Sequence, residues 1–537
     1  MSKPNKKITS KSRQTCWIGA DRLTIEDLEK VIYGKSKVGI SSATWKELNA
    51  GHEFLKKFSQ DKVIYGVNTG FGPMAPYKIP DDKHLELQLN LIRSHCSGSG
   101  KLVSKEQTIA LMIARLSSLA KGYSGIHPEW AELLTQMINE EITPHIYEHG
   151  GLGASGDLVQ LAHLALCIIG EGKVKDNGED RPAKEVFTEK NWTPLRPRIR
   201  EALATLNGTS AMTGYGAINV IKARRLVEWS ELSSALLIEI VGSYDDYYSE
   251  GLNGVKAHAG QQKAARRLRE LLTGSKRLRD RSDHLYCSHE NKKLDDKVQE
   301  YYSIRCLPQI MGPILDTLID SQQTVEDELN SVSDNPIIDY QNENVFHGGN
   351  FHGDYVSLSM DKLKIAITKL SLLIERQLNY LLNDKLNQQL PPFVNMGTLG
   401  LNLGMQGAQF VATSTTSENQ SLCSPVYIHT IPSNNDNQDI VSMGANAALM
   451  ANRVIENTYE VLAVKLLTAI QAVDVLGIQE SLAPKTRKLY DLVRSRVPAF
   501  SQDGIMYEAT HPVLDLLNNT DPQTITGEEK ASKSNNK

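Results

Sequence analysis

The sequence His149-Gly-Gly-Leu-Gly-Ala-Ser-Gly-Asp157 connects an apolar run at residues 142–147 to a helical pattern that begins near Asp157. If Ala154-Ser155-Gly156 folds back tightly, the nitrogen of Gly156 can attack the Ala154 carbonyl, because a residue without a Cβ permits that close approach. Loss of two waters, one of them from Ser155, then leaves a ring with an exocyclic methylidene. Such a ring is an electrophile that none of the twenty side chains supplies. The same letters also fit an ordinary glycine-rich loop that ends in a helix cap at Asp157, so the other motifs of the chain must decide.

Further motifs accompany this stretch. They are Tyr65-Gly-Val-Asn-Thr-Gly-Phe-Gly72, Leu206-Asn-Gly-Thr209, Tyr302-Ser-Ile-Arg305 with Pro308-Gln309, Gly348-Gly-Asn-Phe-His352 and Asn437-Gln-Asp439. Together with the Ala-Ser-Gly tripeptide, they resemble the aromatic amino acid ammonia-lyases and aminomutases that carry a self-made methylidene-imidazolone group (MIO). The resemblance extends from about residue 20 to about residue 510.

Composition points to a cytoplasmic protein without nucleic-acid or membrane partners. The chain has 537 residues, and its 59 basic and 63 acidic residues nearly balance, so no nucleic-acid signal emerges. The six cysteines form no CxxC pair, which favours free thiols in a reducing compartment over a disulfide framework or a zinc site. No apolar signal segment opens the sequence, and no apolar run is long enough to span a membrane.

Helical periodicity dominates the second half of the sequence. Long periodic stretches at 216–242, 356–383 and 444–480 exceed ordinary helix lengths and predict a long central helical bundle. Shorter patterns at 25–32 and 42–58 predict helices in a smaller N-terminal domain that carries the Ala-Ser-Gly loop. The predicted class is therefore mainly α, and the resemblance implies a histidine/phenylalanine ammonia-lyase-like fold. The predicted domain organisation is a disordered arm 1–16, an N-terminal domain 17–205, a bundle domain 206–518 and a disordered tail 519–537.

The chemistry of ammonia elimination sets requirements that these motifs can meet. The β hydrogen is not acidic and an amine is a poor leaving group, so an electrophile must activate the amine and a base must lie over the β carbon. Tyr65 is the candidate base, since a phenolate is strong enough. Arg305 is the candidate partner of the substrate carboxylate, because a guanidinium can bind it bidentately. The spacing of Tyr302 and Arg305 puts both side chains on one helical face.

The resemblance implies further roles. It implies that Tyr65 lies on a lid loop, and that Asn207, Tyr302 and Phe351 surround the prosthetic ring. It also implies that the substrate site includes Gly72, Ser94, His95, Leu158, Gln299, Arg305, Phe351, Asn434 and Gln438. MIO would form without any metal or external cofactor. Three subunits of a homotetramer would contribute to each site, which would explain why the motifs are so far apart in the sequence.

Three positions bear on the choice of substrate. In the resembled family, Ser94-His95 is common in histidine lyases. Gln438 instead matches the tyrosine and phenylalanine enzymes. Histidine lyases carry a glutamate in place of Gln438 and an aspartate in place of His429, and a carboxylate can pair with an imidazole. His95 can also hydrogen-bond a phenolic hydroxyl, and a buried polar group built for that hydroxyl would reject phenylalanine. The whole pattern looks most similar to the bacterial tyrosine ammonia-lyases, and predicts elimination of ammonia from L-tyrosine to give trans-p-coumarate.

Other functions remain open at this point. Phenylalanine or histidine could be the substrate, and a tyrosine 2,3-aminomutase would use the same residues while retaining the cinnamate-like intermediate. A non-catalytic structural relative would be expected to lose Ser155, Tyr65 or Arg305, and all three are present. A fumarase-like lyase shares the long helices, but its Gly-Ser-Ser-x-Met-Pro loop does not occur in the sequence.

Overall fold

The computed structural model describes residues 15–286, 293–294 and 296–527. Almost all of the predicted arm, the end of the predicted tail and Cys287 lie outside these residues. The chain divides into two compact units. Unit 1 comprises Met1–Ile221, Gln322–Asp361 and Pro425–Leu449, and unit 2 comprises Lys222–Ser321, Lys362–Ser424 and Met450–Lys537. The predicted domain boundaries stay predictions.

Unit 1 holds short helices and small sheets. Its helices are α1 (Ile25–Ile32), α2 (Ser42–Phe58), α3 (His84–His95), α4 (Lys105–Ala120), α5 (Pro128–Asn139), α6 (Leu158–Ile168), α7 (Ala183–Lys190) and α8 (Glu201–Leu206). Strands β1 (Thr15–Ile18) and β2 (Lys37–Ile40) pair in parallel. The antiparallel pairs are β3 (Ser99–Leu102) with β5 (Tyr147–His149), β4 (Thr143–Pro144) with β6 (Lys173–Asp176), β6 with β7 (Glu179–Pro182), and β8 (Ile337–Asp339) with β9 (Asn344–Phe346).

Four long helices contain residues of both units. They are α9 (Ser210–Val241), α14 (Leu307–Leu329), α15 (Asp354–Leu382) and α18 (Gly444–Leu476). The remaining helices of unit 2 are α10 (Glu250–Gly254), α11 (Ala259–Leu272), α12 (Arg281–His284), α13 (Tyr302–Arg305), α16 (Asp384–Asn387), α17 (Gln406–Leu422), α19 (Pro484–Arg494), α20 (Met506–Asn519) and α21 (Gln523–Thr526). The prediction of a mainly α fold with long bundled helices is confirmed.

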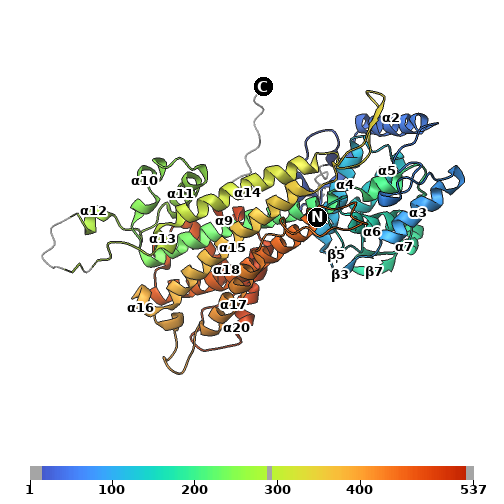
Figure 1. The fold of residues 1–537 in the computed structure, drawn as a ribbon. Coiled ribbons are helices and arrows are strands. Elements are labelled where there is room, and N and C mark those ends of the chain that lie inside the picture. Colours follow the sequence, from blue (N-terminus) through green and yellow to red (C-terminus); the bar gives the residue numbers. More distant parts are fainter. Residues whose placement is uncertain (1–14, 287–292, 295, 528–537) are drawn as a thin grey trace, which may run out of the picture. The chain divides into compact units, whose positions relative to one another are not determined.

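The long helices of unit 2 lie side by side (Figure 1), and buried side-chain hydrogen bonds connect them. Ser234 of α9 donates to Gln377 of α15 at 3.1 Å. Asn419 of α17 donates to Ser371 of α15 at 3.1 Å and to Thr458 of α18 at 3.2 Å. Because buried polar groups are costly when unpaired, these bonds fix the register of one helix against the next. Among the described residues, no helix is long and apolar enough to cross a membrane.

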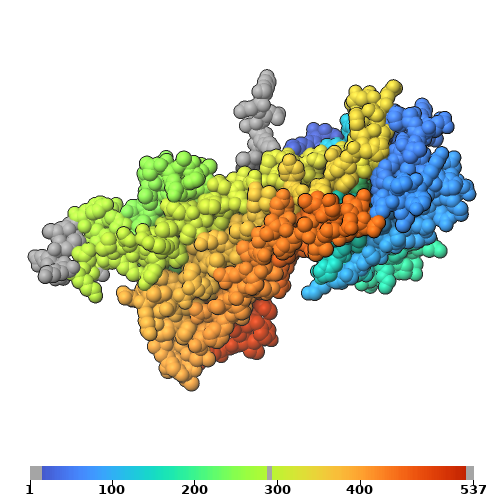
Figure 2. All heavy atoms as spheres, in the orientation of Figure 1, coloured from blue at the N-terminus to red at the C-terminus, as the bar shows by residue number. Residues whose placement is uncertain are grey.

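A small apolar cluster supports the segment that carries Tyr65. Leu55 of α2 and Ile338 of β8 pack with Ile64 and Val67, which flank Tyr65 in the sequence. Figure 2 shows the atoms of the β8–β9 hairpin, in yellow, projecting beside α2, in blue. The cluster therefore anchors both sides of Tyr65 in the core of unit 1.

Candidate active site

The Ala154-Ser155-Gly156 segment forms a tight, largely buried turn. The Gly153 N–H donates to the Gly156 carbonyl at 3.2 Å and closes a ring of backbone around Ala154 and Ser155. Ala154 packs with Val441 and Met443 and is only 4% exposed. The Gly153 carbonyl accepts hydrogen bonds from the Gly353 N–H at 3.0 Å and from the Ser442 hydroxyl at 3.1 Å. The backbone therefore folds back on itself at the tripeptide.

Two glycines allow the turn to lie against the start of α9. Gly156 has φ +73°, and a Cβ placed on it would lie 2.0 Å from the Gly208 carbonyl oxygen. Gly208 has φ +151°, and a Cβ there would lie 2.2 Å from Nη1 of Arg115. Both contacts involve groups with little room to move, so only glycine fits at either position. The backbone of Gly156 can thus approach another backbone segment without obstruction.

Ser155 is held by polar groups at both of its oxygens. The Asn207 amide donates to the Ser155 carbonyl at 2.9 Å, and the Gln438 amide donates to the Ser155 hydroxyl at 3.0 Å. Arg115 donates to the Asn207 carbonyl at 2.9 Å. Helices α6 and α9 begin directly beside this turn, and helix N-termini carry partial positive charge. Three of the predicted site residues, Ser155, Asn207 and Gln438, therefore meet at the turn.

Asp157 has a different role from the helix cap that the sequence allowed. Its carboxylate makes no cap hydrogen bond to α6 and accepts instead from the Met212 N–H of α9 at 2.8 Å. The Asp157 N–H donates to the Gly208 carbonyl at 2.8 Å. Asp157 thus ties the turn to α9. Burial raises the pKa of the fully buried Asp157 carboxyl to about 7.

The raised pKa of Asp157 predicts a stability that falls as the pH rises. Between about pH 4 and pH 7 the folded state keeps a proton that the unfolded chain has lost, so ionisation works against folding, by an amount on the order of 4 kcal/mol. Asp157→Asn keeps an acceptor for the Met212 N–H and cannot ionise. Urea unfolding at pH 5 and pH 8 should show a larger loss for the native chain than for this variant. Equal losses of the free energy of unfolding in the two proteins would show that a group other than Asp157 titrates in this pH range.

Tyr65 is positioned by the loop that follows it. The Gly72 N–H donates to the Tyr65 phenolic oxygen at 3.1 Å, and the Phe71 ring packs edge-on against the Tyr65 ring at 6.4 Å. Gly72 lies directly against Asn434, because a Cβ on Gly72 would be 2.7 Å from the Asn434 amide nitrogen. The Gly72 N–H thus fixes the phenolic oxygen of the residue that the sequence predicts as the base.

One short hairpin carries both Asn434 and Gln438. Backbone hydrogen bonds of 3.1 Å and 3.3 Å join Ser433 and Gln438, and Asn434, Asn435 and Asp436 all have positive φ. Asparagine and aspartate adopt this left-handed conformation more readily than other non-glycine residues. The hairpin therefore links the Tyr65–Gly72 loop at one end to Ser155 at the other.

A cavity of about 610 Å³ in unit 1 contains the predicted ring-reading pair. It is lined by Ser94, His95, Asn434 and nine neighbours, namely Gly70, Phe71, Pro73, Met74, Tyr77, Ile79, Leu87, Asn90, and Leu91, with Asn435 at its edge. His95 Nδ1 lies 2.9 Å from the Leu91 carbonyl and 3.1 Å from the Ser94 hydroxyl. Because a carbonyl only accepts, we assign the ring proton to Nδ1, which leaves Nε2 of a neutral His95 as an acceptor.

The other predicted residues of unit 1 flank the same turn. Leu158 is the first residue of α6, two positions after Gly156. Phe351 precedes Gly353, whose N–H contacts Gly153. Twelve of the predicted residues thus belong to unit 1, and contacts connect most of them to the Ala-Ser-Gly turn or to the cavity.

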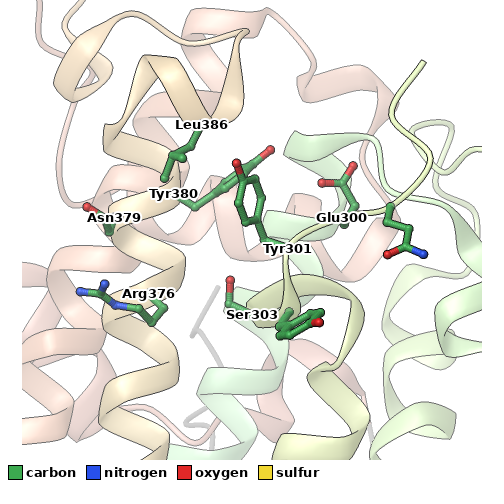
Figure 3. A pocket seen from close by; sticks show the side chains of 9 residues that line it. Glu300, Tyr301, Ser303, Arg376, Asn379, Tyr380 and Leu386 are labelled. Carbon is green, nitrogen blue, oxygen red and sulfur yellow. The ribbon is translucent and has the colours of Figure 1, made fainter. Parts of the chain in front are cut away.

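Gln299, Tyr302 and Arg305 belong to unit 2. Gln299 and Tyr302 line a cavity of about 550 Å³, which Figure 3 shows between Glu300 and Tyr301 on one side and Arg376 and Tyr380 on the other. The Arg305 guanidinium lies over the Tyr302 ring, 4.6 Å from its centre, as the predicted common face requires. Tyr302 is 68% exposed. Within the described parts of the chain, no group accepts a hydrogen bond from the buried Nε of Arg305.

Sequence reasoning missed several residues at the site. The position of Asp157 directly after the tripeptide was a usable signal in the sequence. Its hydrogen bond to α9 could not be predicted from the sequence. Arg115, Asn90 and Tyr77 had no local signal, since only the fold brings them to Asn207 or to the cavity. In the part of the chain that the structure describes, no group of three or more His, Cys, Asp or Glu side chains could hold a metal ion.

Known proteins resemble this chain over most of its length. The model of the aromatic amino acid lyase family matches residues 23–495. A tyrosine ammonia-lyase from Cupriavidus metallidurans is 42% identical over 483 residues, which are 88% of this chain and 90% of that protein. An MIO-dependent tyrosine 2,3-aminomutase from Streptomyces globisporus is 38% identical over 509 residues, 93% of this chain and 94% of that protein. The crystal structure of a histidine ammonia-lyase from Trypanosoma cruzi superposes with a TM-score of 0.86 at 30% identity and covers 96% of this chain and 95% of that one.

These matches confirm the resemblance that the motifs carried, and they make the chain an enzyme of the ammonia-lyase type. The names of the relatives span tyrosine and histidine as substrates, and both elimination and amino-group migration as reactions. The family as a whole depends on MIO and acts on aromatic amino acids. With a family model matched from residue 23 to residue 495, this chain belongs to the aromatic amino acid lyase family.

Proposed function

We propose that the protein is a tyrosine ammonia-lyase that converts L-tyrosine to trans-p-coumarate and ammonium. The observation that carries the choice of tyrosine is the hydrogen bond between His95 Nδ1 and the Leu91 carbonyl. It makes Nε2 an acceptor, and the cavity provides room for a phenol beside it. A phenolic O–H can donate to Nε2, whereas phenylalanine would leave that nitrogen unpaired.

MIO would form from Ala154, Ser155 and Gly156, and the residues present fit its formation. The turn is closed and glycine is required at position 156, while Gln438 donates to the hydroxyl that must leave as water. Asn207 holds the Ser155 carbonyl. When formed, the ring supplies an electrophile for the substrate amine, so that ammonia can depart from a carbon that no side chain of the protein could activate.

Tyr65 would remove the β proton. Its phenolic oxygen accepts a hydrogen bond from the Gly72 N–H, which fixes the position of that oxygen. Phe71 packs against the Tyr65 ring and orients it. Asn434, which lies against Gly72, belongs to the same hairpin as Gln438, and Gln438 donates to the Ser155 hydroxyl. One continuous set of contacts therefore positions the base and the electrophile.

Gln299, Tyr302 and Arg305 would act from another subunit of a homotetramer. Arg305 has a buried Nε without an acceptor among the described residues, which suits a substrate carboxylate, and Tyr302 presents a largely exposed ring. Large apolar side chains are also exposed on α15 and α17, and burial between subunits would remove them from water. They include Tyr355, Leu358, Ile365, Phe410 and Val411. A cytoplasmic location stays a prediction of the sequence.

Replacing His95 with phenylalanine should shift the substrate preference. The variant loses the acceptor for the phenol and gains an apolar wall, so kcat/KM for tyrosine relative to phenylalanine should fall by about 10- to 100-fold. Initial rates with each amino acid measure this ratio. His84→Phe, at the other end of α3, is the matched control and should leave the ratio unchanged. A ratio of kcat/KM in His95→Phe as high as in His84→Phe would show that His95 does not contact the ring of the substrate.

The products distinguish the proposal from its alternatives. Purified protein should be given tyrosine, phenylalanine and histidine together, with no added cofactor, and the products identified by mass spectrometry. p-Coumarate with ammonium supports the proposal. A β-amino acid isomer of tyrosine as main product would establish an aminomutase, and urocanate would mean that Ser94-His95 reads an imidazole ring.

A further inference from the structure

A backbone hydrogen bond attaches residues 96–98, which follow His95, to α6. Helix α3 ends at His95, the Ser97 N–H donates back to the His95 carbonyl at 2.9 Å, and β3 begins at Ser99. Between them, the Gly98 N–H donates to Nε2 of His163 at 3.2 Å. A Cβ on Gly98 would lie 2.9 Å from that nitrogen and 3.0 Å from the Tyr147 Cβ, so the contact is closely packed.

His163 can make this bond only in one protonation state. A backbone N–H donates, so Nε2 must carry a lone pair and the ring must be neutral with its proton on Nδ1. Burial lowers the pKa of His163, and His145 lowers it further. Protonation would replace the acceptor with a second donor that faces the Gly98 N–H, and the attachment would be lost.

Several titratable groups surround His163. The Tyr147 ring lies 5.2 Å from it, and His145 is paired with Asp180 at 3.0 Å. Burial raises the pKa of Cys96 to about 12, and it raises that of Cys167, one turn along α6, so both thiols stay neutral. The other titratable residues of the elements packed here are His84, Glu86, Arg93 and His95 of α3, Glu129 and Glu132 of α5, Glu201 of α8, Lys101 of β3, and Glu148 and His149 of β5.

We propose that His163 is a positioning residue, which holds residues 96–98, directly after His95, at a fixed place on α6 and thereby sets the preference for a hydroxylated ring. Helix α6 starts at Leu158 beside the Ala-Ser-Gly turn, and Asp157 ties that start to α9. One rigid helix therefore connects the place where the amine reacts with the place where the ring is read. The inference rests on the proposed function, because it assigns His95 to the substrate ring.

Two variants test the proposal. In His163→Gln the side-chain oxygen can still accept the Gly98 N–H but cannot be protonated, whereas His163→Leu has no acceptor. At pH 8, His163→Leu should lower the tyrosine-to-phenylalanine ratio of kcat/KM by about fivefold, mainly through tyrosine, and His163→Gln should restore it. On acidification below about pH 6.5, the ratio should fall more steeply in the native chain than in His163→Gln. His127→Gln, which replaces another partly buried histidine of lowered pKa, should keep the native profile.

Each of the opposite results would overturn the proposal. These are a native ratio in His163→Leu, a ratio in His163→Gln as low as in His163→Leu, or superimposable pH profiles of His163→Gln and the native chain. If His163→Leu does not fold, the pH comparison decides alone. If the native chain turns over no tyrosine, the proposed function fails instead. Hydrogen exchange of residues 95–102 then tests the contact between Gly98 and His163. Exchange should be faster in His163→Leu than in His163→Gln, and equal rates would refute the attachment.

Discussion

Ser155→Ala should abolish ammonia release and leave the chain at its full unmodified mass. Alanine has no hydroxyl to lose as water, so the exocyclic methylidene cannot form, although the turn closed by Gly153 and Gly156 can still fold. Without an electrophile for the amine, the remaining residues cannot replace the missing chemistry, and the rate should fall to the background of the assay. Intact-protein mass spectrometry should find the native chain lighter by two water molecules and the variant not.

Ser442→Ala is the matched control for this experiment. The Ser442 hydroxyl contacts the same turn, at the Gly153 carbonyl, but is not part of the tripeptide. This variant should therefore still lose the two waters. Native activity in Ser155→Ala, or a native chain of unmodified mass that is active, would refute the assignment of the prosthetic group to these residues.

Tyr65→Phe should lower kcat by about a hundredfold to ten-thousandfold, the range typical of a lost general base. The phenyl ring can still pack against Phe71, so folding and the mass of the protein should stay native. Substrate binding should change little, since the loss falls on proton removal. Steady-state kinetics with tyrosine, together with the intact mass, separates a missing base from a missing prosthetic group.

Tyr77→Phe provides the comparison for the Tyr65 variant. Tyr77 lies on the same loop, lines the cavity and is largely exposed, so its hydroxyl should matter far less. If the two variants lost similar activity, the effect would come from the loop as a whole, and a near-native rate in Tyr65→Phe would assign the base to another group.

Local patterns predicted the helices because each has a local cause. The predicted helix 42–58 coincides with α2, where the Ser41 hydroxyl caps the first turn. The pattern 444–480 ran past the end of α18, because Gly477 adopts φ +62° and stops the helix at Leu476. The pattern 216–242 began later than α9, which starts at Ser210. In the structure Gly214 allows α9 to pack closely on α4, and a Cβ there would lie 2.4 Å from the Leu111 nitrogen.

The motifs predicted the residues that take part in the chemistry of the site, whereas the residues that support them could be found only from the fold. Ser155, Asn207 and Gln438 were predicted from separate stretches, and the structure places them in contact. Arg115 and His163 carry no local signal of any kind, because each acts on a backbone group far along the chain. Tyr302 and Arg305 were predicted to share a helical face, and α13 shows that they do. Which subunit of an assembly would supply them to a given site is not encoded in any local stretch of one chain.

The contact between Gly156 and Gly208 restricts how the protein can be evolved in the laboratory. Saturation mutagenesis at either position should yield almost only inactive clones, because every other residue would collide with a neighbouring carbonyl or guanidinium. A library spends its diversity better at Asn90 and Tyr77, which line the cavity and have no such neighbour imposed on them. New substrate preferences are therefore to be sought by varying the residues that line the cavity, while Gly156 and Gly208 should be kept unchanged.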